Sequence, residues 1–291
     1  MKPASFEYHR PASIGEALDL LALHGAQGKL ISGGQSLVPM MNMRLASPAH
    51  LIDINDLSEL AGVRDQGDAV EIGTLTRHCE VVSSALLKKH CPLLPKAAAT
   101  IGHHAIRQRG TLGGSLAHAD PAAQMALVAR TLDARITLAS RSGEREVASG
   151  AFFEGAMATV VRPDEMIVRV RYPKLLPQER SSFKLFSRRH GDFAIISVAV
   201  LLEVHEGWVR KLLIGLNGAS PAPLRLDAVA AEFLGKTPDA RWVEALGLAV
   251  SRAITPEDSA RIPPIYRREL ARGLTVQALQ ELLAERKGDV A

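Results

Sequence analysis

The first sixty residues combine helical and strand-like hydrophobic spacing. Apolar residues recur at helical intervals over residues 14–22, and Ser13 with Glu16 forms a capping-box pattern at the start of this segment. Short apolar runs at residues 29–31 and 51–54 indicate strands, because glycine and polar residues bound them. This opening segment is therefore predicted to be a small α/β unit.

The middle of the chain mixes helices with strands. A strand is predicted at residues 70–72. Asp120 followed by Pro121 is typical of a helix start, and this helix is expected to run to about residue 132. Further helices are predicted at residues 81–87 and 93–100, and further strands at residues 135–139, 145–148 and 166–171.

Two prolines, Pro173 and Pro177, bracket a polar stretch that favours a domain boundary. Beyond it, three apolar runs predict an antiparallel meander and three periodic segments predict helices. The runs are residues 182–187, 194–204 and 209–216, and the helices are residues 227–234, 241–253 and 275–286. We predict an α+β protein with parts at residues 1–60, 61–176 and 177–291.

Composition narrows the class of protein. With 291 residues, 47% of them hydrophobic, the chain can bury cores without disulfides or structural metals. The net charge of +4 includes no long basic run and aromatic residues make up 4%, which disfavours nucleic-acid binding. No stretch reaches the roughly 20 apolar residues of a membrane span, and the N-terminus lacks the apolar core of a secretory signal. A cytoplasmic location is expected. Cys79 and Cys91 are too few for an iron–sulfur cluster, so any such cluster is expected on another chain.

Two glycine pairs carry the most informative chemistry. The strand at residues 29–31 runs directly into Gly33 and Gly34, and a second pair lies within residues 110–115. Glycine permits positive φ and close approach of a ligand, so successive backbone N–H groups can surround an anion. Two such loops suit a diphosphate, although either pair alone fits a tight turn at least as well. Neither loop has Rossmann or P-loop spacing, which disfavours both classes.

Three segments together resemble a known family. Residues 32–37 (SGGQSL), 101–103 (IGH) and 107–121 (RQRGTLGGSLAHADP) are similar to the FAD-binding medium subunit of molybdenum hydroxylases. The group that the chain most resembles is the aerobic carbon monoxide dehydrogenase medium subunits, related to the flavin domain of xanthine dehydrogenase. The resemblance covers nearly the whole chain. It implies a two-lobed PCMH-type FAD-binding domain followed by a C-terminal domain of a small antiparallel sheet and helices.

The resemblance implies a non-covalently bound FAD in a cleft between the first two lobes. The backbone of residues 32–36 and 111–115 would surround its pyrophosphate. Ile101 would pack near the flavin, the backbone of Ile167 would contact the cofactor, and Lys184 would reach the isoalloxazine ring. No residue matches a catalytic role or a metal ligand. The positions that match the cofactor site are Leu30, Ile31, Ser32, Gly33, Gly34, Gln35, Ser36, Leu37, Ile101, Thr111, Gly113, Gly114, Ser115, Gln124, Ile167, Lys184 and Phe193.

Three of these positions depart from the family pattern. Gln124 stands where relatives commonly have Asp or Glu toward the ribose, so any hydrogen bond there lacks charge assistance. Gln35 stands where some relatives have His, which removes a candidate for covalent attachment of the flavin. Phe193 stands where relatives often have Tyr near the flavin, so the hydroxyl is lost and the apolar contact is kept.

Other polar residues near the second loop have less specific interpretations. His103, His104 and His118 lie close in sequence, but nothing in their spacing fixes a metal geometry, so loop hydrogen bonds or contacts with a cofactor or partner are expected. Arg107 and Arg109 either neutralise diphosphate charge, pair with another subunit or are solvated.

The absence of an acid–base or nucleophile pattern predicts that the cofactor supplies the chemistry. The resemblance implies an electron-transfer flavoprotein subunit. It would take electrons from [2Fe–2S] clusters on a small partner subunit and pass them to an external acceptor, with the molybdenum cofactor on a large partner. Two alternatives remain open: a stand-alone FAD-dependent oxidase or dehydrogenase of a small organic substrate, and a scaffolding or nucleotide-binding subunit whose flavin site has decayed.

Overall fold

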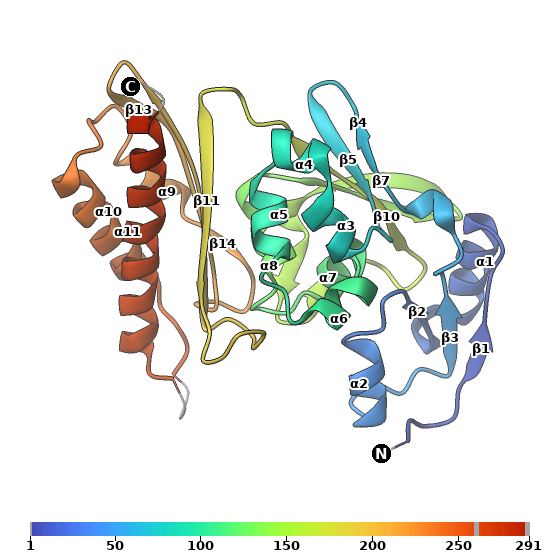
Figure 1. Ribbon diagram of the computed structural model, residues 1–291. Helices are drawn as coiled ribbons and strands as arrows, with labels where there is room; N and C mark the ends of the chain where they lie inside the picture. Colours follow the sequence, from blue (N-terminus) through green and yellow to red (C-terminus); the bar gives the residue numbers. More distant parts are fainter. Residues whose placement is uncertain (1, 259–261, 289–291) are drawn as a thin grey trace.

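The computed structural model describes residues 2–258 and 262–288, and its elements form three groups along the chain (Figure 1). In Figure 1 the first group lies at the right, the second in the centre and the third at the left. No helix within these described residues has the length and apolar character needed to cross a membrane.

The first group is a three-stranded sheet of order β1-β3-β2 in which both pairings are parallel. The Ser13 hydroxyl accepts a hydrogen bond from the Glu16 N–H (3.2 Å), so the predicted helix start is confirmed. Strand β2 ends one residue before the first glycine loop. The elements are β1 (Glu7–His9), α1 (Ile14–His24), β2 (Gly28–Ile31), α2 (Leu37–Asn42) and β3 (His50–Asp53), with short 3-10 turns at Gly25–Gln27 and Ser58–Leu60.

The second group is a five-stranded antiparallel sheet of order β4-β5-β10-β6-β7, covered by six short helices. The pairing of β10 with β6 shifts register between Ile167 and Arg169, which is a β-bulge. The elements are β4 (Val63–Asp65), β5 (Ala69–Gly73), α3 (His78–Ser83), α4 (Ala85–His90), α5 (Leu93–Ala98), α6 (His104–Arg109), α7 (Leu112–His118), α8 (Gln124–Thr131), β6 (Arg135–Ser140), β7 (Gly143–Ala148), a 3-10 turn (Ser149–Ala151), β8 (Phe153–Gly155), β9 (Ala158–Thr159) and β10 (Met166–Pro173).

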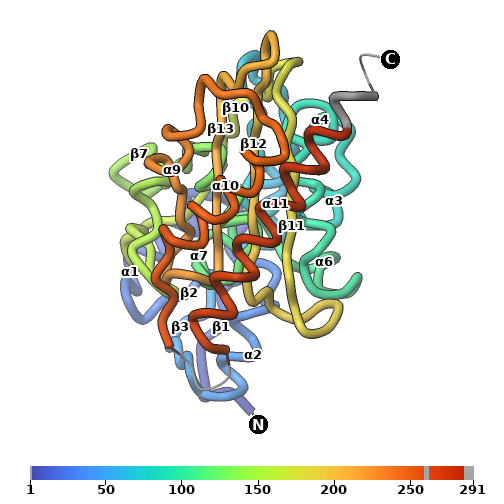
Figure 2. Tube along the Cα trace, turned by 90° about the vertical axis from the view of Figure 1, so that its left-hand side faces the viewer, coloured from blue at the N-terminus to red at the C-terminus, as the bar shows by residue number. Residues whose placement is uncertain are grey.

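The third group is the predicted antiparallel meander, with two long helices across its outer face (Figure 2). Side chains of β12 alternate between two cores. Val198 and Val200 pack with α10 and α11, whereas Ala199 and Leu201 join the core of the second group, which explains the unbroken apolar run in this strand. The elements are β11 (Glu179–Phe186), β12 (Ile196–His205), β13 (Trp208–Asn217), β14 (Leu224–Arg225), α9 (Asp227–Ala231), α10 (Ala240–Ala253) and α11 (Pro264–Gly288).

A smaller core joins the first group to the second. It combines Leu18 and Ile52 of the first group with Leu75, Met166 and Val168 of the second. The first sheet is therefore held against the end of the central sheet by apolar packing, and the segment after β2 faces the helices of the second group (Figure 1).

Several predicted helix boundaries are wrong. The Asp120 carboxylate accepts from the Ala122 N–H (2.7 Å) in a turn, and the helix begins only at Gln124, with Ala123 as its N-cap. The helix expected at residues 81–87 is divided between α3 and α4, because Ser84 caps α4 through a bond from the Leu87 N–H (3.3 Å).

Candidate cofactor site

The two glycine loops lie against each other. Ser32 Oγ is 3.0 Å from Thr111 Oγ1, although the two residues are 79 positions apart. A Cβ on Gly33 would come within 2.3 Å of the carbonyl oxygen of Arg109, and a Cβ on Gly114 would come within 3.0 Å of Ser32 Oγ. Any side chain at either glycine would push the loops apart.

Asn55 and Arg77 hold the loops at this separation. The Asn55 side-chain amide donates to the carbonyl oxygen of Ser32 (2.8 Å) and accepts from the Arg77 guanidinium (2.6 Å). The same guanidinium donates to the carbonyl oxygen of Arg109, just before the second loop. This arrangement, which we name the Asn55–Arg77 clamp, links the first group of elements to the second through polar contacts.

Asp53 fixes the orientation of Asn55. Its carboxylate accepts from the Asn55 backbone N–H (2.9 Å), the Asn55 side chain (2.6 Å) and the Tyr8 hydroxyl (2.6 Å). Burial disfavours the charged form of Asp53, but these hydrogen bonds outweigh burial and lower its pKa. The carboxylate is therefore an acceptor at neutral pH, and the Asn55 amide points its donor at Ser32.

Four consecutive backbone amides of the first loop are free. Within the described part of the chain, no hydrogen bond engages the N–H groups of residues 33–36. Gly34 has a φ of +69°, a conformation that lets successive N–H groups point to one side, and most of the loop is only partly exposed. These donors fit a phosphate group.

The second loop offers fewer free donors than the sequence analysis expects. The N–H of Leu112 donates to Thr76, that of Gly113 to Thr74 (2.9 Å) and those of Gly114 and Ser115 to Thr111. A Cβ on Gly113 would come within 1.6 Å of Thr74 Oγ1, so this glycine serves close packing. The second loop is thus a buried support for the first, and it adds the hydroxyl groups of Thr111 and Ser115.

His78 lies beside the second loop as a neutral imidazole. Its backbone N–H donates to the carbonyl oxygen of Gly110 (2.9 Å), and its ring would be 2.8 Å from a Cβ on that glycine. Burial, and then the positive charges of Arg107 and Arg77, lower the pKa of His78 to about 4. Its Nδ1 is buried and has no hydrogen-bond partner among the described residues.

Comparison with known proteins identifies the family of the chain. Residues 4–175 match a family model described as the FAD binding domain in molybdopterin dehydrogenase. The chain belongs to this family. Residues 181–282 match a second model, described as the CO dehydrogenase flavoprotein C-terminal domain. The predicted family, cofactor and oxidoreductase class are confirmed: the chain is an FAD-binding oxidoreductase subunit.

Several relatives align along almost the whole chain. The 6-hydroxypseudooxynicotine dehydrogenase complex subunit alpha of Paenarthrobacter nicotinovorans is 36% identical, covering 97% of this chain and 96% of its own. The carbon monoxide dehydrogenase medium chain of Hydrogenophaga pseudoflava is 34% identical, covering 96% and 97%. A solved carbon monoxide dehydrogenase from Hydrogenophaga pseudoflava superposes with a TM-score of 0.93 at 35% identity, covering 96% of this chain and 98% of that one. The predicted α+β fold is therefore confirmed.

Some of the other positions expected at the FAD site lie close to the two loops. Leu30 and Ile31 are half-buried at the end of β2, and Leu37 begins α2. Gln35 is exposed and donates to the carbonyl oxygen of Gly33 (2.9 Å). Ile101 packs on the edge of the central core. These positions lie on or beside the loops, and their contact with FAD stays a prediction.

Three expected positions have buried or paired side chains, and their contact with FAD stays a prediction. The side chain of Ile167 is buried in the central core, and that of Gln124 is buried at the start of α8. The ammonium group of Lys184 is 2.5 Å from Glu281 Oε2, on the face of β11 that packs on α11. Adjacent side chains on a strand point to opposite faces, and Phe183 faces the central core. The structure therefore does not bring Lys184 to the glycine loops.

The segment between β11 and β12 reaches back toward the second group. Gly191 lies against the His103 ring, since a Cβ on this glycine would be 2.4 Å from that ring. The rings of His103 and His190 are 5.7 Å apart. Phe193, in the same segment, is 73% exposed. An aromatic ring this exposed is available to a ligand or a partner.

Another basic residue near the loops, Arg107, has a structural role. The Arg107 guanidinium donates to the carbonyl oxygens of Ile101 (2.9 Å) and Gly102 (3.1 Å). Sequence reasoning missed Asn55 and Arg77 because neither belongs to a motif or a periodic pattern. The one available signal was that Asn55 follows the end of β3, where polar side chains gather beside a loop.

Proposed function

We propose that this chain is the flavoprotein electron-transfer subunit of a molybdenum-containing hydroxylase or dehydrogenase complex. It holds FAD non-covalently, accepts electrons from [2Fe–2S] clusters on a small partner subunit and passes them to an external acceptor. The molybdenum cofactor belongs to a large partner. The observation that carries this proposal is the first glycine loop, with four free amides held against the second loop.

The residues of the chain bind and orient the cofactor. The N–H groups of residues 33–36 would donate to the pyrophosphate, with the hydroxyl groups of Ser32 and Thr111 beside them. The Asn55–Arg77 clamp keeps these donors in place before the ligand arrives, which reduces the entropy lost on binding. FAD itself supplies the electron-accepting chemistry once bound.

Support for a multi-subunit complex comes from the relatives and from cysteine content. Relatives that match the whole chain are named as medium chains or as subunits of dehydrogenase complexes. The chain has only two cysteines, and Cys91 is buried with its pKa raised to about 12 by burial. An electron donor of the iron–sulfur class therefore requires another polypeptide. A complex of this composition would work in the cytoplasm.

The test compares the isolated chain with the chain assembled with its two partners. We expect the isolated chain to bind FAD without oxidising small organic substrates, and its flavin to be reduced when the reduced [2Fe–2S] subunit is added. Substrate oxidation by the isolated chain would establish the stand-alone oxidase instead. A chain that binds no FAD, alone or in the complex, would establish the decayed site.

A pair of glycine variants tests the loop itself. Gly33→Ala places a Cβ 2.3 Å from the Arg109 carbonyl oxygen and should lower FAD affinity at least about tenfold, because the loops must separate. Gly155→Ala is the control, since a Cβ there meets nothing within 4 Å. Equal FAD affinity in the two variants would contradict the assigned site.

A further inference from the structure

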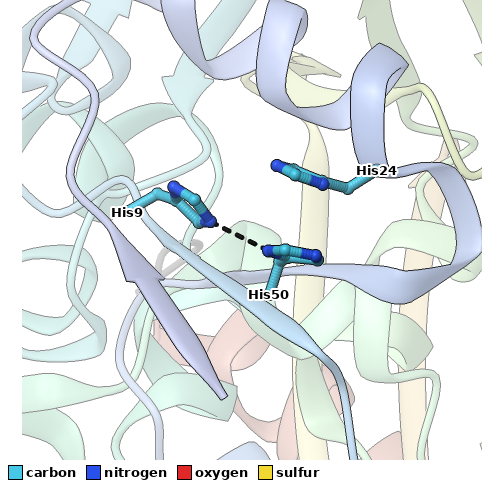
Figure 3. Close-up of side chains that lie close together, drawn as sticks. All are labelled: His9, His24 and His50. Carbon is cyan, nitrogen blue, oxygen red and sulfur yellow. Dashed lines mark hydrogen bonds between the residues drawn. The ribbon is translucent and has the colours of Figure 1, made fainter.

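Three histidines from three elements converge on the first sheet, away from the glycine loops. His9 ends β1, His24 ends α1 and His50 begins β3 (Figure 3). Each offers a ring nitrogen, and these three atoms lie within 4.8 Å of one another.

The backbone explains why the rings meet. In the parallel pairing of β1 with β3, His50 lies opposite Glu7, and His9 follows two residues later on the same face. In the pairing of β2 with β3, His50 lies opposite Gly28. A Cβ on Gly28 would be 3.2 Å from the Cβ of His24, so the lack of a side chain there leaves room for the end of α1.

The distances suit one metal ion shared by two of the histidines. His9 Nε2 is 3.1 Å from His50 Nδ1. In a tetrahedral zinc site with Zn–N distances near 2.0 Å, two ligand atoms lie roughly 3.3 Å apart. Two facing imidazole nitrogens need either one proton or one cation between them, because both cannot present lone pairs.

A carboxylate completes the ligand set. Glu7 Oε2 is 3.4 Å from His50 Nδ1 and 4.0 Å from His9 Nε2. Its side chain is 73% exposed, whereas the side chains of His9 and His50 are 22% and 15% exposed. Glu7 can therefore move the short distance to a bound ion. The ligand set of imidazoles and one carboxylate, without a thiolate, is typical of zinc and of neighbouring divalent transition metals.

His24 requires the largest adjustment. Its ring is stacked on that of His50, with centroids 3.6 Å apart and planes at 17°. A metal bound by both would turn His24 out of the stack so that its nitrogen points at the ion. His24 is the last residue of α1 and is only half-buried, so its χ angles have room to change.

We propose that His9, His24 and His50, with Glu7, form a binding site for one divalent transition-metal ion of the zinc class. The site lies at the Gly28 end of β2, and the first glycine loop follows the other end. The four residues of β2 span roughly 13 Å, so the ion lies apart from the first glycine loop. Its role is structural: it joins the end of α1 to β1 and β3.

The experiment uses the full chain without a polyhistidine tag. After dialysis against a chelator, Zn²⁺ is titrated calorimetrically, and Co²⁺ is added separately because its visible spectrum reports coordination geometry. We expect one equivalent of Zn²⁺, a tetrahedral Co²⁺ spectrum and a rise in melting temperature. FAD content is measured in parallel, so this result stands apart from that for the cofactor site.

Single variants assign the ligands. His50→Ala and His24→Gln should each weaken Zn²⁺ binding by more than roughly tenfold. Loss of a residue that only supports a ligand costs roughly tenfold, and loss of a ligand itself costs more. His205→Gln is the matched control, because His205 lies in the exposed β12–β13 hairpin. His24→Gln changes a half-buried side chain at a helix end, so it keeps the test valid if His50→Ala fails to fold. The proposal would be overturned if no Zn²⁺ binds or if the Co²⁺ spectrum is octahedral. It would also be overturned if His24→Gln and His205→Gln bind Zn²⁺ equally strongly.

Discussion

Acid pH should destabilise this protein through His78 before its carboxylates titrate. The pKa of His78 is lowered to about 4 in the fold by burial and by Arg107 and Arg77, against 6.5 for an unperturbed imidazole. Because the folded pKa is the lower one, the unfolded chain takes up the proton first as pH falls. The stability from keeping His78 neutral is full above about pH 6.5 and is lost progressively toward about pH 4.

The size of the effect follows from the two pKa values. With 6.5 for the unfolded chain and about 4 for the fold, linkage gives a loss of about 2 kcal/mol at about pH 5 and about 3 kcal/mol at about pH 4. The upper part of this window lies above the range in which Asp and Glu titrate. The part of the slope between about pH 6.5 and 5 that is lost on removing the imidazole of His78 therefore reports this residue; His24, whose pKa is also lowered by burial, contributes a slope of the same sign.

The assay is urea unfolding of the full chain at fixed FAD concentration across this pH window, because bound ligand adds to stability. The change is His78→Gln, which cannot titrate, and His205→Gln is the control for an exposed imidazole. We expect the slope to be shallower in His78→Gln, while the control keeps the slope of the unmodified chain. A slope as steep in His78→Gln as in the control would refute the assignment of a neutral buried imidazole.

Three further changes test the support of the site. Gly113→Ala should destabilise the fold by about 3 kcal/mol or more in urea unfolding, because its Cβ would come within 1.6 Å of Thr74 Oγ1; unchanged stability would contradict the packing. Arg77→Met should lower FAD affinity about tenfold in equilibrium titration and stability by about 1 to 2 kcal/mol, because it removes the two hydrogen bonds that Arg77 makes in the Asn55–Arg77 clamp; unchanged FAD affinity would show that the loops keep their separation without Arg77. Lys184→Met should lower stability by at most about 1 kcal/mol and leave FAD affinity unchanged, because its ammonium pairs with Glu281; a large loss of FAD would restore its expected flavin contact.

Elements with strong periodicity were predictable from the sequence, and contacts between them were not. The β12 run and its neighbours form the predicted meander because their apolar side chains pack on both faces of the sheet. The helix start predicted at Asp120 was wrong because an Asp side chain can either cap a helix or close a turn. In this chain it closes a turn. The sequence of each glycine loop alone also fits a tight turn. That the two loops lie side by side was therefore predicted from the family resemblance.

The polar partners of the site were the least predictable part. Asn55 and Arg77 are 22 positions apart, and their bond depends on how the first sheet docks on the second. Strand alternation and Glu281 direct the side chain of Lys184 to α11, and its contact with the isoalloxazine ring stays a prediction. His9, His24 and His50 each look ordinary in sequence, and only the strand register brings them together.

The first loop has more free hydrogen-bond donors than free acceptors, and its glycines alone do not explain this difference. Four of the five carbonyl oxygens of residues 32–36 are used within the chain: that of Ser32 accepts from Asn55, that of Gly33 from Gln35, and those of Gly34 and Ser36 from the backbone of α2. Its amides from residue 33 to 36 are unused. A ligand therefore meets four unpaired N–H donors but a single loop carbonyl oxygen, that of Gln35, that no described residue engages, because residue 39 is a proline and has no N–H to donate. The excess of donors favours an anion over a cation. Gln35 contributes to this selectivity because its side chain donates to the carbonyl oxygen of Gly33 and so removes that oxygen from the free acceptors.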